Sequence, residues 1–323
     1  MDNSFVLMTG TDLKVSALCM GTATIGSTFD ESISFNLLDT FVEYGGNFLD
    51  TAHNYADWAY PVRSVSEKTI GKWMKVRRNR EKIILGTKVA QINMETMHVR
   101  LSENELISDL DECLSCLQTD YIDLLWLHRD DENIPVEYII DMMNKQVTAG
   151  KIRYFGCSNW SAHRIKQAYD FVSEKKEFTS FIANQPMWSC ALINSESLSD
   201  KTVKVMDDYM FCLHKKHQLT AVPFTSQARG FFTKLHTGTG TALDKIYGSL
   251  ENEMRFERIK KVSQDLSRSI GAVSLAYLKS QPFPTVPIIG FKDKNQLIEN
   301  LKVMDFLLEP DTVLYIKGCD LLF

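Results

Sequence analysis

The chain has no apolar run of the roughly 18 residues that a membrane-spanning helix needs. Its first ten residues, MDNSFVLMTG, contain neither a basic region nor a long apolar segment, so we expect no secretory signal. Basic residues are not in excess, because 36 Lys and Arg stand against 41 Asp and Glu and give a net charge of −5. Nucleic-acid binding needs clustered Lys and Arg. We therefore expect neither a membrane nor a nucleic acid as a partner.

The cysteines form no ligand pattern. The seven Cys are an odd number in a chain of 323 residues, and reduced thiols in the cytoplasm are the plain interpretation. Cys113 and Cys116 form a CxxC, but they lie in the helical pattern ISDLDECLSCL without a second Cys/His pair nearby. Small core residues on one helix face explain them better than a metal or redox site. We expect no metal.

The composition is that of a globular protein, with 44% hydrophobic residues. Length alone suggests about two domains, but α/β barrels of this size often form one. No linker and no internal repeat interrupts the chain. We therefore expect a single domain over residues 1–323.

Short apolar runs alternate with helical patterns along the sequence. The runs are rich in β-branched and aromatic residues and apolar almost throughout, which suits parallel strands buried on both faces. There are eight of them: VSALCMGTA (15–23), GNFLDTA (46–52), KIILGTKV (82–89), YIDLLWLH (121–128), IRYFGCSN (152–159), SFIANQP (180–186), LTAVPFT (219–225) and TVPIIGF (285–291).

The segments between the runs predict helices. Ser102 with Glu105 three residues later matches a capping box, and residues 199–217 carry apolar residues at helical spacing. Eight strands alternating with helices predict a closed (β/α)8 TIM barrel. The alternative is a doubly wound open sheet, but no GxGxxG follows the first run, where GTATIG has the wrong spacing.

Two segments fall outside this alternation. FVLMTGTDLKVS predicts a β-hairpin with its turn at TGTD, which could cap the barrel bottom because it precedes the first barrel strand. Residues 227–253 are rich in Thr and Gly without an apolar period, and we interpret them as a long loop after the seventh strand, with a lid as one possible role.

Polar residues stand where the predicted strands end. Asp50 ends the second strand, Lys88 the third and His128 the fourth, while Tyr55 lies in the loop after Asp50. The carboxyl ends of barrel strands meet at one rim. An apolar core has no use for such groups, so they must pair with one another or contact a ligand.

The segments that carry these residues resemble successive signatures of the aldo-keto reductases, in order and over nearly the whole chain. They are GNFLDTAHNY, ILGTK, YIDLLWLH, GKIRYFGCSNW, NQPMWS, AVPFTSQARGFF and VPIIGFKDKNQLIEN, and LKVSALCMGTATIG is similar to the family's first strand. The resemblance implies the barrel already predicted and the reversible reduction of an aldehyde or ketone by NAD(P)H.

The resemblance also implies a catalytic tetrad of Asp50, Tyr55, Lys88 and His128. Tyr55 would be the general acid in reduction and the base in oxidation. Lys88 would lower the pKa of Tyr55, and Asp50 would hold Lys88 in place. His128 would orient the carbonyl oxygen.

For the cofactor, the resemblance implies three groups of residues. Ser158, Asn159 and Gln185 would hydrogen-bond the nicotinamide carboxamide, and Trp188 would stack on its ring. The remaining contacts would come from Gly21 and Thr22 after the first strand, from Phe224, Thr225, Ser226, Arg229 and Gly230 around the pyrophosphate, and from Gly290, Lys292, Gln296 and Asn300 around the adenosine phosphate. Many relatives have Arg where Gln296 stands, so NADPH is expected and NADH stays open.

The substrate end is less determined. Ile25, Trp58, Tyr60 and Trp160 could form an apolar, aromatic pocket for a small carbonyl compound or sugar, or could be loop packing. A cofactor-binding redox sensor or accessory subunit is the alternative function, and a Lys88 Schiff-base aldolase is a third. A monomer or small homo-oligomer is expected.

Overall fold

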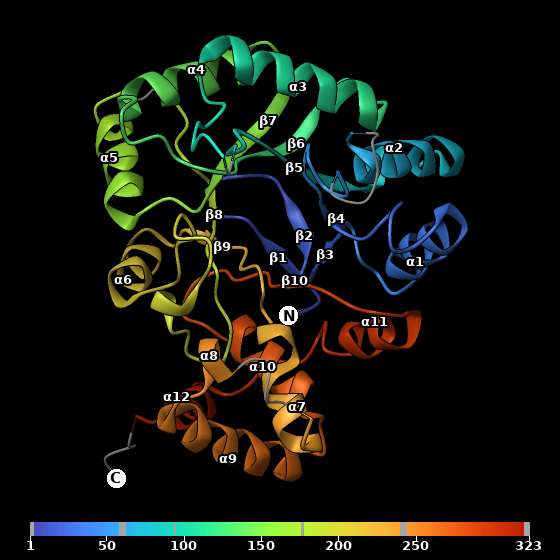
Figure 1. The fold of residues 1–323 in the computed structure, drawn as a ribbon, viewed down its shortest axis with the longest axis vertical. Coiled ribbons are helices and arrows are strands. Elements are labelled where there is room, and N and C mark those ends of the chain that lie inside the picture. Colours follow the sequence, from blue (N-terminus) through green and yellow to red (C-terminus); the bar gives the residue numbers. More distant parts are fainter. Residues whose placement is uncertain (1–2, 58–62, 94, 176–177, 240–243, 320–323) are drawn as a thin grey trace.

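The structure is a computed structural model that describes residues 3–57, 63–93, 95–175, 178–239 and 244–319. Eight parallel strands form one sheet in the order β10-β3-β4-β5-β6-β7-β8-β9. The two ends of this order meet, because the backbone N–H of Val286 donates to the carbonyl of Ala221 at 2.8 Å and that of Ile288 to Pro223 at 3.0 Å. The sheet is therefore a closed barrel, as predicted (Figure 1).

Each strand lies inside one of the eight apolar runs. Their bounds are Cys19–Gly21 (β3), Phe48–Asp50 (β4), Ile84–Val89 (β5), Ile122–Leu127 (β6), Ile152–Ser158 (β7), Ala183–Gln185 (β8), Thr220–Ala221 (β9) and Ile288–Ile289 (β10). All residues of β4, β6, β8, β9 and β10 are buried. This burial explains the unbroken apolar runs, since one strand face meets the barrel interior and the other meets the helices.

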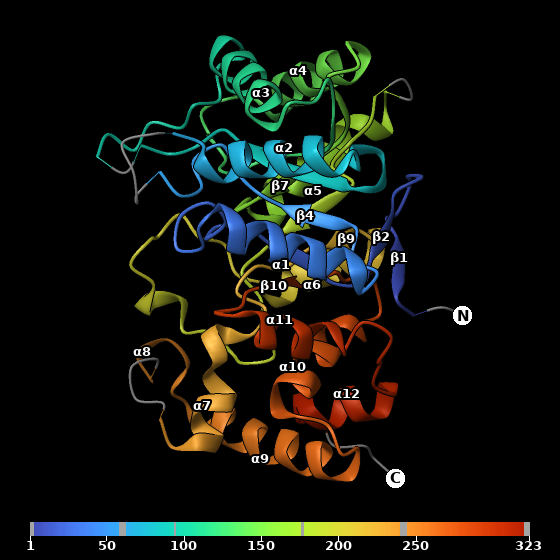
Figure 2. The same cartoon turned by 90° about the vertical axis from the view of Figure 1, so that its right-hand side faces the viewer.

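Helices surround the barrel, and α7, α8, α9 and α12 gather at one side of it in both ribbon views (Figures 1 and 2). The bounds are Glu31–Glu43 (α1), Val65–Arg77 (α2), Glu103–Leu117 (α3), Val136–Thr148 (α4), Ala162–Ser173 (α5), Asp208–His217 (α6), Phe231–Thr237 (α7), Asp244–Tyr247 (α8), Leu250–Asp265 (α9), Ile270–Lys279 (α10), Lys294–Leu301 (α11) and Pro310–Lys317 (α12). The predicted capping box of Ser102 and Glu105 begins α3. No helix within the described ranges is long and apolar enough to span a bilayer.

The helix predicted over residues 199–217 is shorter than expected. It begins at Asp208, because Asp207 is its N-cap and accepts from the backbone N–H of Met210 at 2.7 Å. Before it, residues 201–202 form a turn, and Val205 forms a bridge with Met187. Helical spacing of apolar residues is therefore a misleading signal for this segment, where Val205 pairs with Met187, two residues beyond the end of β8.

The prediction of a long loop over residues 227–253 also needs correction. Residues 231–237 form α7, residues 244–247 form α8, and α9 begins at Leu250. Phe231 and Phe232 are buried, and Leu235 is partly buried. One turn with apolar residues is enough to hold a short helix in place. A helix this short shows no clear apolar period in a segment rich in Thr and Gly, so the sequence does not reveal it.

The predicted N-terminal hairpin is present and covers one end of the barrel. Its strands are Phe5–Leu7 (β1) and Lys14–Ser16 (β2), paired antiparallel. Met8, Leu13 and Val15 pack with barrel-interior residues such as Phe48 and Trp126. Figure 2 places this hairpin at the end of the barrel opposite α7 and α8.

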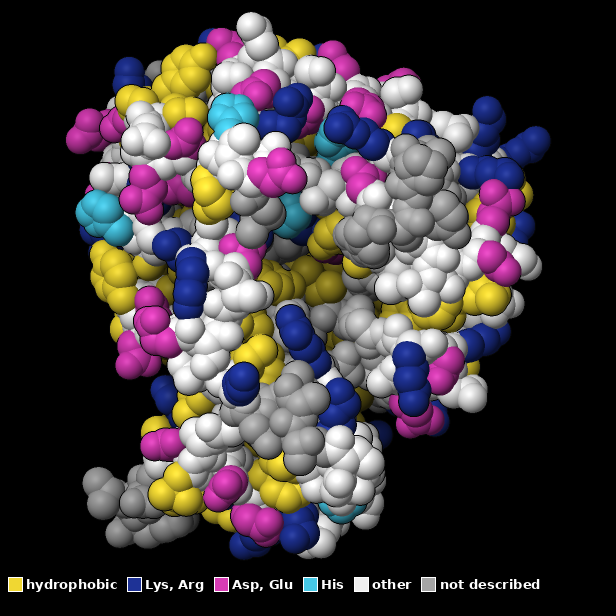
Figure 3. All heavy atoms as spheres, in the orientation of Figure 1, with side chains coloured by type: hydrophobic (Ala, Val, Ile, Leu, Met, Phe, Trp, Pro, Cys, Tyr) yellow, Lys and Arg dark blue, Asp and Glu magenta, His cyan; other side chains and the backbone are white. Residues whose placement is uncertain are grey.

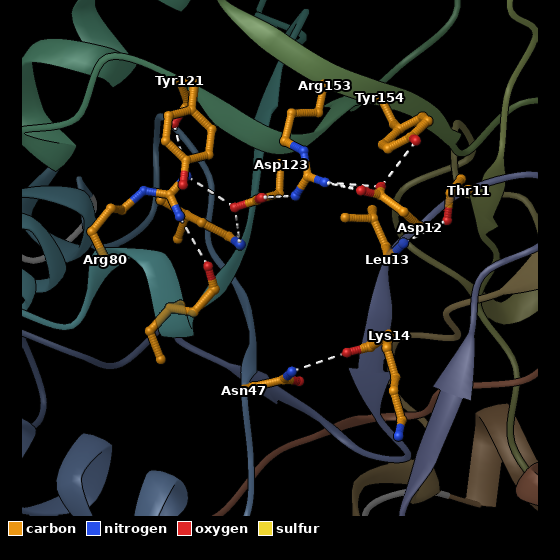
Figure 4. A network of polar contacts seen from close by, with 12 residues as sticks. Thr11, Asp12, Leu13, Lys14, Asn47, Arg80, Tyr121, Asp123, Arg153 and Tyr154 are labelled. Atoms are coloured by element: carbon orange, nitrogen blue, oxygen red, sulfur yellow. Dashed lines mark hydrogen bonds and ion pairs between the residues drawn. The ribbon is translucent and has the colours of Figure 1, made fainter.

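A polar network fixes the hairpin to the strands (Figure 4). Asp123 of β6 is buried and pairs with Arg80 at 2.9 Å and with Arg153 at 2.7 Å. Oδ2 of Asp123 also accepts a hydrogen bond from the backbone N–H of Leu85 at 3.0 Å. Arg153 also binds Asp12 in the hairpin turn at 2.7 Å. One buried carboxylate therefore connects two strands and, through Arg153, the hairpin.

A buried histidine should make stability depend on pH. His214 of α6 is fully buried, with Nδ1 2.8 Å from the carbonyl of Leu219 and Nε2 3.1 Å from Nδ2 of Asn184. Burial lowers the pKa of His214 from 6.5 to about 4. Below pH 6.5 the unfolded chain takes up a proton that the folded chain does not, so stability is lost as the pH falls towards 4.

We expect this loss to reach about 3 kcal/mol near pH 4. Urea unfolding of the wild type and of His214→Gln at pH 7 and 4.5 would measure it, because the variant lacks the titrating group and should lose less stability. The exposed His163 offers a matched control, since His163→Gln should leave the pH dependence unchanged. Equal losses in the wild type and in His214→Gln would contradict the expectation.

Candidate functional site

Three of the expected tetrad residues are set at the ends of neighbouring strands. Asp50 is the last residue of β4, Lys88 lies next to the end of β5, and His128 directly follows β6. The backbone N–H of His128 donates to Val89 at 2.8 Å and continues the pairing of β5 with β6. Strand alternation and register thus bring together residues that are nearly 80 positions apart in the sequence.

Lys88 is the centre of the contacts at this rim. Its Nζ donates to Asp50 Oδ2 at 2.6 Å, to the carbonyl of Thr51 at 2.8 Å and to Tyr55 Oη at 2.9 Å. Asp50 and Lys88 are buried. An ammonium has three N–H donors, and these three acceptors match them. The geometry therefore leaves the amine in contact with both a carboxylate and a phenol.

The pKa values differ from the sequence-based expectation in one respect. Burial raises the pKa of Tyr55 above its usual value, and the neighbouring Lys88 lowers it only in part. Burial alone would lower the pKa of Lys88, but Asp50 and Tyr55 together raise it. Tyr55 is consequently protonated and Lys88 charged at neutral pH, so the phenol is in the form that can donate a proton.

His128 is held neutral. Burial lowers the pKa of His128 well below its usual value, and the charges of Lys88 and Arg129 lower it further. Arg129 in turn donates to the carbonyl of His128 at 2.9 Å and pairs with Asp200 at 2.9 Å. A neutral imidazole at this place can donate a hydrogen bond to an oxygen without adding a charge.

Gln185 joins this cluster from β8 and has a free acceptor. Its Nε2 donates to Asp50 Oδ1 at 2.7 Å, and its buried Oε1 has no hydrogen-bond partner among the described residues. A buried amide oxygen without a partner costs free energy. An N–H donor such as a carboxamide would satisfy it, which is the group expected here from a nicotinamide.

Ser158 and Asn159 lie beside Gln185 but are largely occupied within the chain. Ser158 donates to the carbonyl of Gln185 at 3.0 Å. Asn159 has a left-handed backbone with a φ of 59°, and its amide donates to the carbonyl of His128 at 3.1 Å. Its Oδ1 accepts from the backbone N–H of Lys204 at 3.3 Å. Contacts of these two residues with a cofactor stay a prediction.

A cavity of about 710 Å³ opens beside Asp50 and Tyr55. At this end of the molecule, Figure 3 shows a hollow with apolar side chains inside it and Lys and Arg side chains around it. Ten of the residues expected to contact the cofactor line the cavity: Gly21, Thr22, Phe224, Thr225, Ser226, Arg229, Gly230, Gly290, Lys292 and Gln296. The size is that of a typical small-molecule site.

The loop after β9 lines the cavity with an unusual backbone. Thr225, Ala228 and Arg229 have φ values of 54°, 48° and 53°, a region that non-glycine residues rarely adopt. Gly230 follows at 79°. Strain of this kind is concentrated at functional sites. The backbone N–H groups of Ala228 and Gly230 already donate within this loop, to the carbonyls of Thr225 at 2.8 Å and Gln227 at 2.7 Å.

Positive charge lines the same cavity. Arg229, Lys234 and Lys292 border it, and within the described part of the chain none of the three forms an ion pair with a carboxylate. Unpaired cations around a cavity favour an anionic ligand.

Gln296 and Asn300 of α11 have different places. Gln296 lines the cavity, and its Oε1 accepts from the backbone N–H of Lys292 at 2.8 Å, so that its amide N–H groups remain for a ligand. Asn300 is buried and is not among the described lining residues. It accepts from Gln227 at 2.8 Å and donates to Gly290 at 3.1 Å, and therefore joins two lining segments.

Trp188, which is expected to stack on the nicotinamide, packs among other aromatic side chains in the structure. It is buried, and its ring packs at 6.0 Å from Phe283 and 6.1 Å from Phe211 of α6. It is not among the described residues that line the cavity, whereas the half-buried Phe224 is. The sequence could not distinguish the two, because both aromatics follow a strand end.

The structure places two of the residues expected in the substrate pocket in the hydrophobic core. Ile25 and Trp160 are fully buried, and Trp160 packs edge-on against Phe181 at 4.9 Å. Their side chains belong to the hydrophobic core and do not reach the cavity surface. Trp58 and Tyr60 lie outside the described residues.

Several lining residues were not expected from the sequence. They are Ala23, Thr24, Gln227, Phe232, Thr233, Lys234, Thr239, Gly271, Ser274, Ile288, Ile289 and Phe291. The lining residues of α7 are not expected from the sequence, because residues 227–253 are interpreted there as a loop. The signal that could have revealed them is the pair Phe231 and Phe232, which fixes one face of α7 against the protein.

Known proteins of one family are similar to this chain. The model of the Aldo/keto reductase family matches residues 17–321. The aryl-alcohol dehydrogenase [NADP(+)] of Phanerodontia chrysosporium is 29% identical, covering 97% of this chain and 86% of that protein. A norsolorinic acid reductase of Aspergillus flavus is 28% identical, over 95% of this chain and 78% of that protein.

The fold has a solved counterpart. A crystal structure of a thermostable aldo-keto reductase in complex with the inhibitor epalrestat matches with a TM-score of 0.73 and 22% identity, covering 98% of this chain and 99% of that one. At this identity the likeness supports the fold. The family match itself extends over nearly the whole chain, so the protein belongs to the Aldo/keto reductase family.

Proposed function

We propose that the protein is an NADP(H)-dependent oxidoreductase that reduces an aldehyde or ketone to an alcohol, reversibly. The observation that carries the proposal is the contact of Lys88 Nζ with both Asp50 and Tyr55 at the rim of the cavity. A charged amine next to a buried phenol is an arrangement for moving a proton at that phenolic oxygen. Family membership supplies the reaction class.

In this proposal Tyr55 donates the proton to the carbonyl oxygen in reduction and accepts it in oxidation. Lys88 stabilises the phenolate left behind, and Asp50 keeps Lys88 charged and in place. His128, held neutral, donates a hydrogen bond to the same oxygen and orients it. Bound NADPH would supply the hydride.

Three features of the site suit such a cofactor. The buried Oε1 of Gln185, next to Asp50 although Gln185 is not among the described lining residues, suits the carboxamide, and the cation of Arg229 at the cavity would attract the pyrophosphate. Phe224 is one of the aromatic side chains of the described lining, with Phe232 and Phe291, and could contact a nicotinamide ring. These features support the proposal and define the residues to test.

The preference for NADPH over NADH rests on the three cations. A 2′-phosphate adds two negative charges that Arg229, Lys234 and Lys292 could neutralise, and nothing in NADH replaces it. The names of the relatives suggest aromatic carbonyl compounds as the first substrates to try. We therefore propose aromatic aldehydes as the leading substrate class.

We expect purified protein to oxidise NADPH in the presence of aromatic aldehydes, with kcat/KM at least about tenfold higher for NADPH than for NADH. Lys292→Met should raise the KM for NADPH about tenfold and leave that for NADH nearly unchanged, because one charge-assisted contact is lost. Lys294→Met is a matched control, since Lys294 is not among the lining residues. Steady-state kinetics with both cofactors would measure these values.

Two results would contradict the proposal. Equal use of NADPH and NADH, unchanged by Lys292→Met, would contradict the cofactor preference. Tight cofactor binding without turnover of aldehydes, ketones or sugars would favour the non-catalytic alternative, a redox-sensing or accessory subunit.

A further inference from the structure

Glu67 is a fully buried carboxylic acid outside the catalytic cluster. Its Oε1 accepts from the hydroxyl of Thr87 at 2.5 Å, and its Oε2 has no hydrogen-bond partner among the described residues. Burial raises the pKa of Glu67, while Thr87 and the thiol of Cys113 lower it in part. A buried carboxyl is costly unless it is hydrogen-bonded, so the contacts of Glu67 with Thr87 and Cys113 are what hold it in this place.

The residue before it in α2 is equally buried and makes a parallel contact. Ser66 Oγ lies 3.1 Å from Thr51 Oγ1 and donates to the carbonyl of Thr22 at 2.8 Å. Ser66 and Glu67 both lie in the first turn of α2, which runs along the outside of the barrel beside α1 and α3 (Figures 1 and 2). One helical turn therefore hydrogen-bonds the ends of neighbouring strands.

The two threonines are neighbours of catalytic residues in the sequence. Thr51 directly follows Asp50, and Thr87 directly precedes Lys88. Successive side chains of a strand point to opposite faces. Asp50 and Lys88 meet each other, while the hydroxyls of Thr51 and Thr87 meet α2. The carbonyl of Thr51 also accepts from Lys88 Nζ at 2.8 Å.

We propose that Ser66 and Glu67 are positioning residues for the reaction, which hold the ends of β4 and β5 through Thr51 and Thr87 and so fix the contact of Lys88 with Tyr55. This inference rests on the proposed function. The tolerance is small, because Lys88 Nζ reaches its three acceptors at distances of 2.6 to 2.9 Å. A displacement near 1 Å can cost on the order of 100-fold in rate.

The test is Thr87→Val, which removes the hydroxyl and keeps the shape. We expect kcat for aldehyde reduction to fall about 10- to 100-fold, with the KM for NADPH within about twofold of the wild type. Thr87→Ser should restore most of the activity. Thr69→Val is the matched control. Thr69 lies on α2, the helix of Ser66 and Glu67, and its hydroxyl donates to the carbonyl of Val65 within that helix and not to a strand end.

The pH profile of alcohol oxidation separates positioning from simple packing. Oxidation needs deprotonated Tyr55, and a displaced Lys88 no longer lowers the pKa of that phenol. In Thr87→Val the profile should therefore move to higher pH, whereas Thr69→Val should leave it in place. If Thr87→Val does not fold, Ser66→Ala tests the same inference with the same two measurements.

A folded Thr87→Val or Ser66→Ala variant with wild-type kcat and an unshifted profile would overturn the inference. Failure of this inference can be distinguished from failure of the proposed function. If the wild type reduces carbonyl compounds and Tyr55→Phe does not, the proposed function holds whatever the threonine variant does. Lack of carbonyl turnover in the wild type would contradict both the proposed function and this inference.

Discussion

Tyr55→Phe should reduce the rate of carbonyl reduction about 1,000-fold, the loss expected when a positioned general acid is removed. The ring and its contact with Lys88 are retained, since Nζ lies 4.4 Å from the ring centroid and keeps its bonds to Asp50 and Thr51. Only the phenolic oxygen is lost. NADPH affinity should therefore stay within about threefold of the wild type, because no direct cofactor contact is removed.

Single-turnover kinetics and a fluorescence titration with NADPH would measure the two quantities separately. Tyr169→Phe is the matched control. Its phenol also donates a hydrogen bond, to the carbonyl of Phe181 at 2.7 Å, but it lies on α5 and is not among the cavity residues. We expect that variant to keep wild-type turnover. Substantial reduction by Tyr55→Phe would show that another group supplies the proton.

The pKa direction adds a second expectation for the same residue. Since burial raises the pKa of Tyr55, the phenol remains protonated through neutral pH. Reduction should stay nearly constant over that range and decline only as the pH rises through the raised pKa, while oxidation should increase there. The rates of reduction and oxidation should thus change in opposite directions with pH, because both depend on the protonation of Tyr55.

The largest loss of stability is expected from Asp123→Ala. Its carboxylate pairs with Arg80 and Arg153 and accepts from the backbone of Leu85, and its side chain is only 3% exposed. Removal leaves the guanidinium of Arg80, 17% exposed, without this partner. Breaking a buried ion pair by deleting one member costs about 3 to 5 kcal/mol. We expect a loss of about 3 kcal/mol, because Arg153 is partly exposed and retains Asp12.

Urea unfolding of Asp123→Ala and Asp12→Asn would check this expectation. Asp12 binds the same Arg153, but its side chain is 68% exposed, and exposed pairs contribute at most about 1 kcal/mol. The contrast between the two variants isolates the effect of burial, since one arginine is common to both. A loss below about 1 kcal/mol for Asp123→Ala would show that water replaces the carboxylate at the barrel end.

The eight barrel strands could be located from the sequence for a definite reason. A strand covered on both faces must be apolar almost throughout, so β6 stands out in the sequence without reference to any other segment. Parallel strands all end at the same rim. The convergence of Asp50, Lys88 and His128 followed from that rule and from their positions at the ends of three runs.

The direction of individual side chains was decided by the tertiary structure. Trp188 and Phe224 both follow strand ends, yet one packs against α6 and the other borders the cavity. Ile25 and Trp160 are fully buried. Which aromatic borders the cavity depends on the space left by helices far away in the sequence, and no local pattern encodes that space.

The sequence by itself determined the barrel, the capping hairpin and the place of the expected catalytic residues, because each depends on local periodicity and on the shared direction of parallel strands. Only the tertiary structure decided the sign of the Tyr55 pKa shift and the contacts of Glu67 with Thr87. Both arise from burial, which is the sum of contacts between segments distant along the chain.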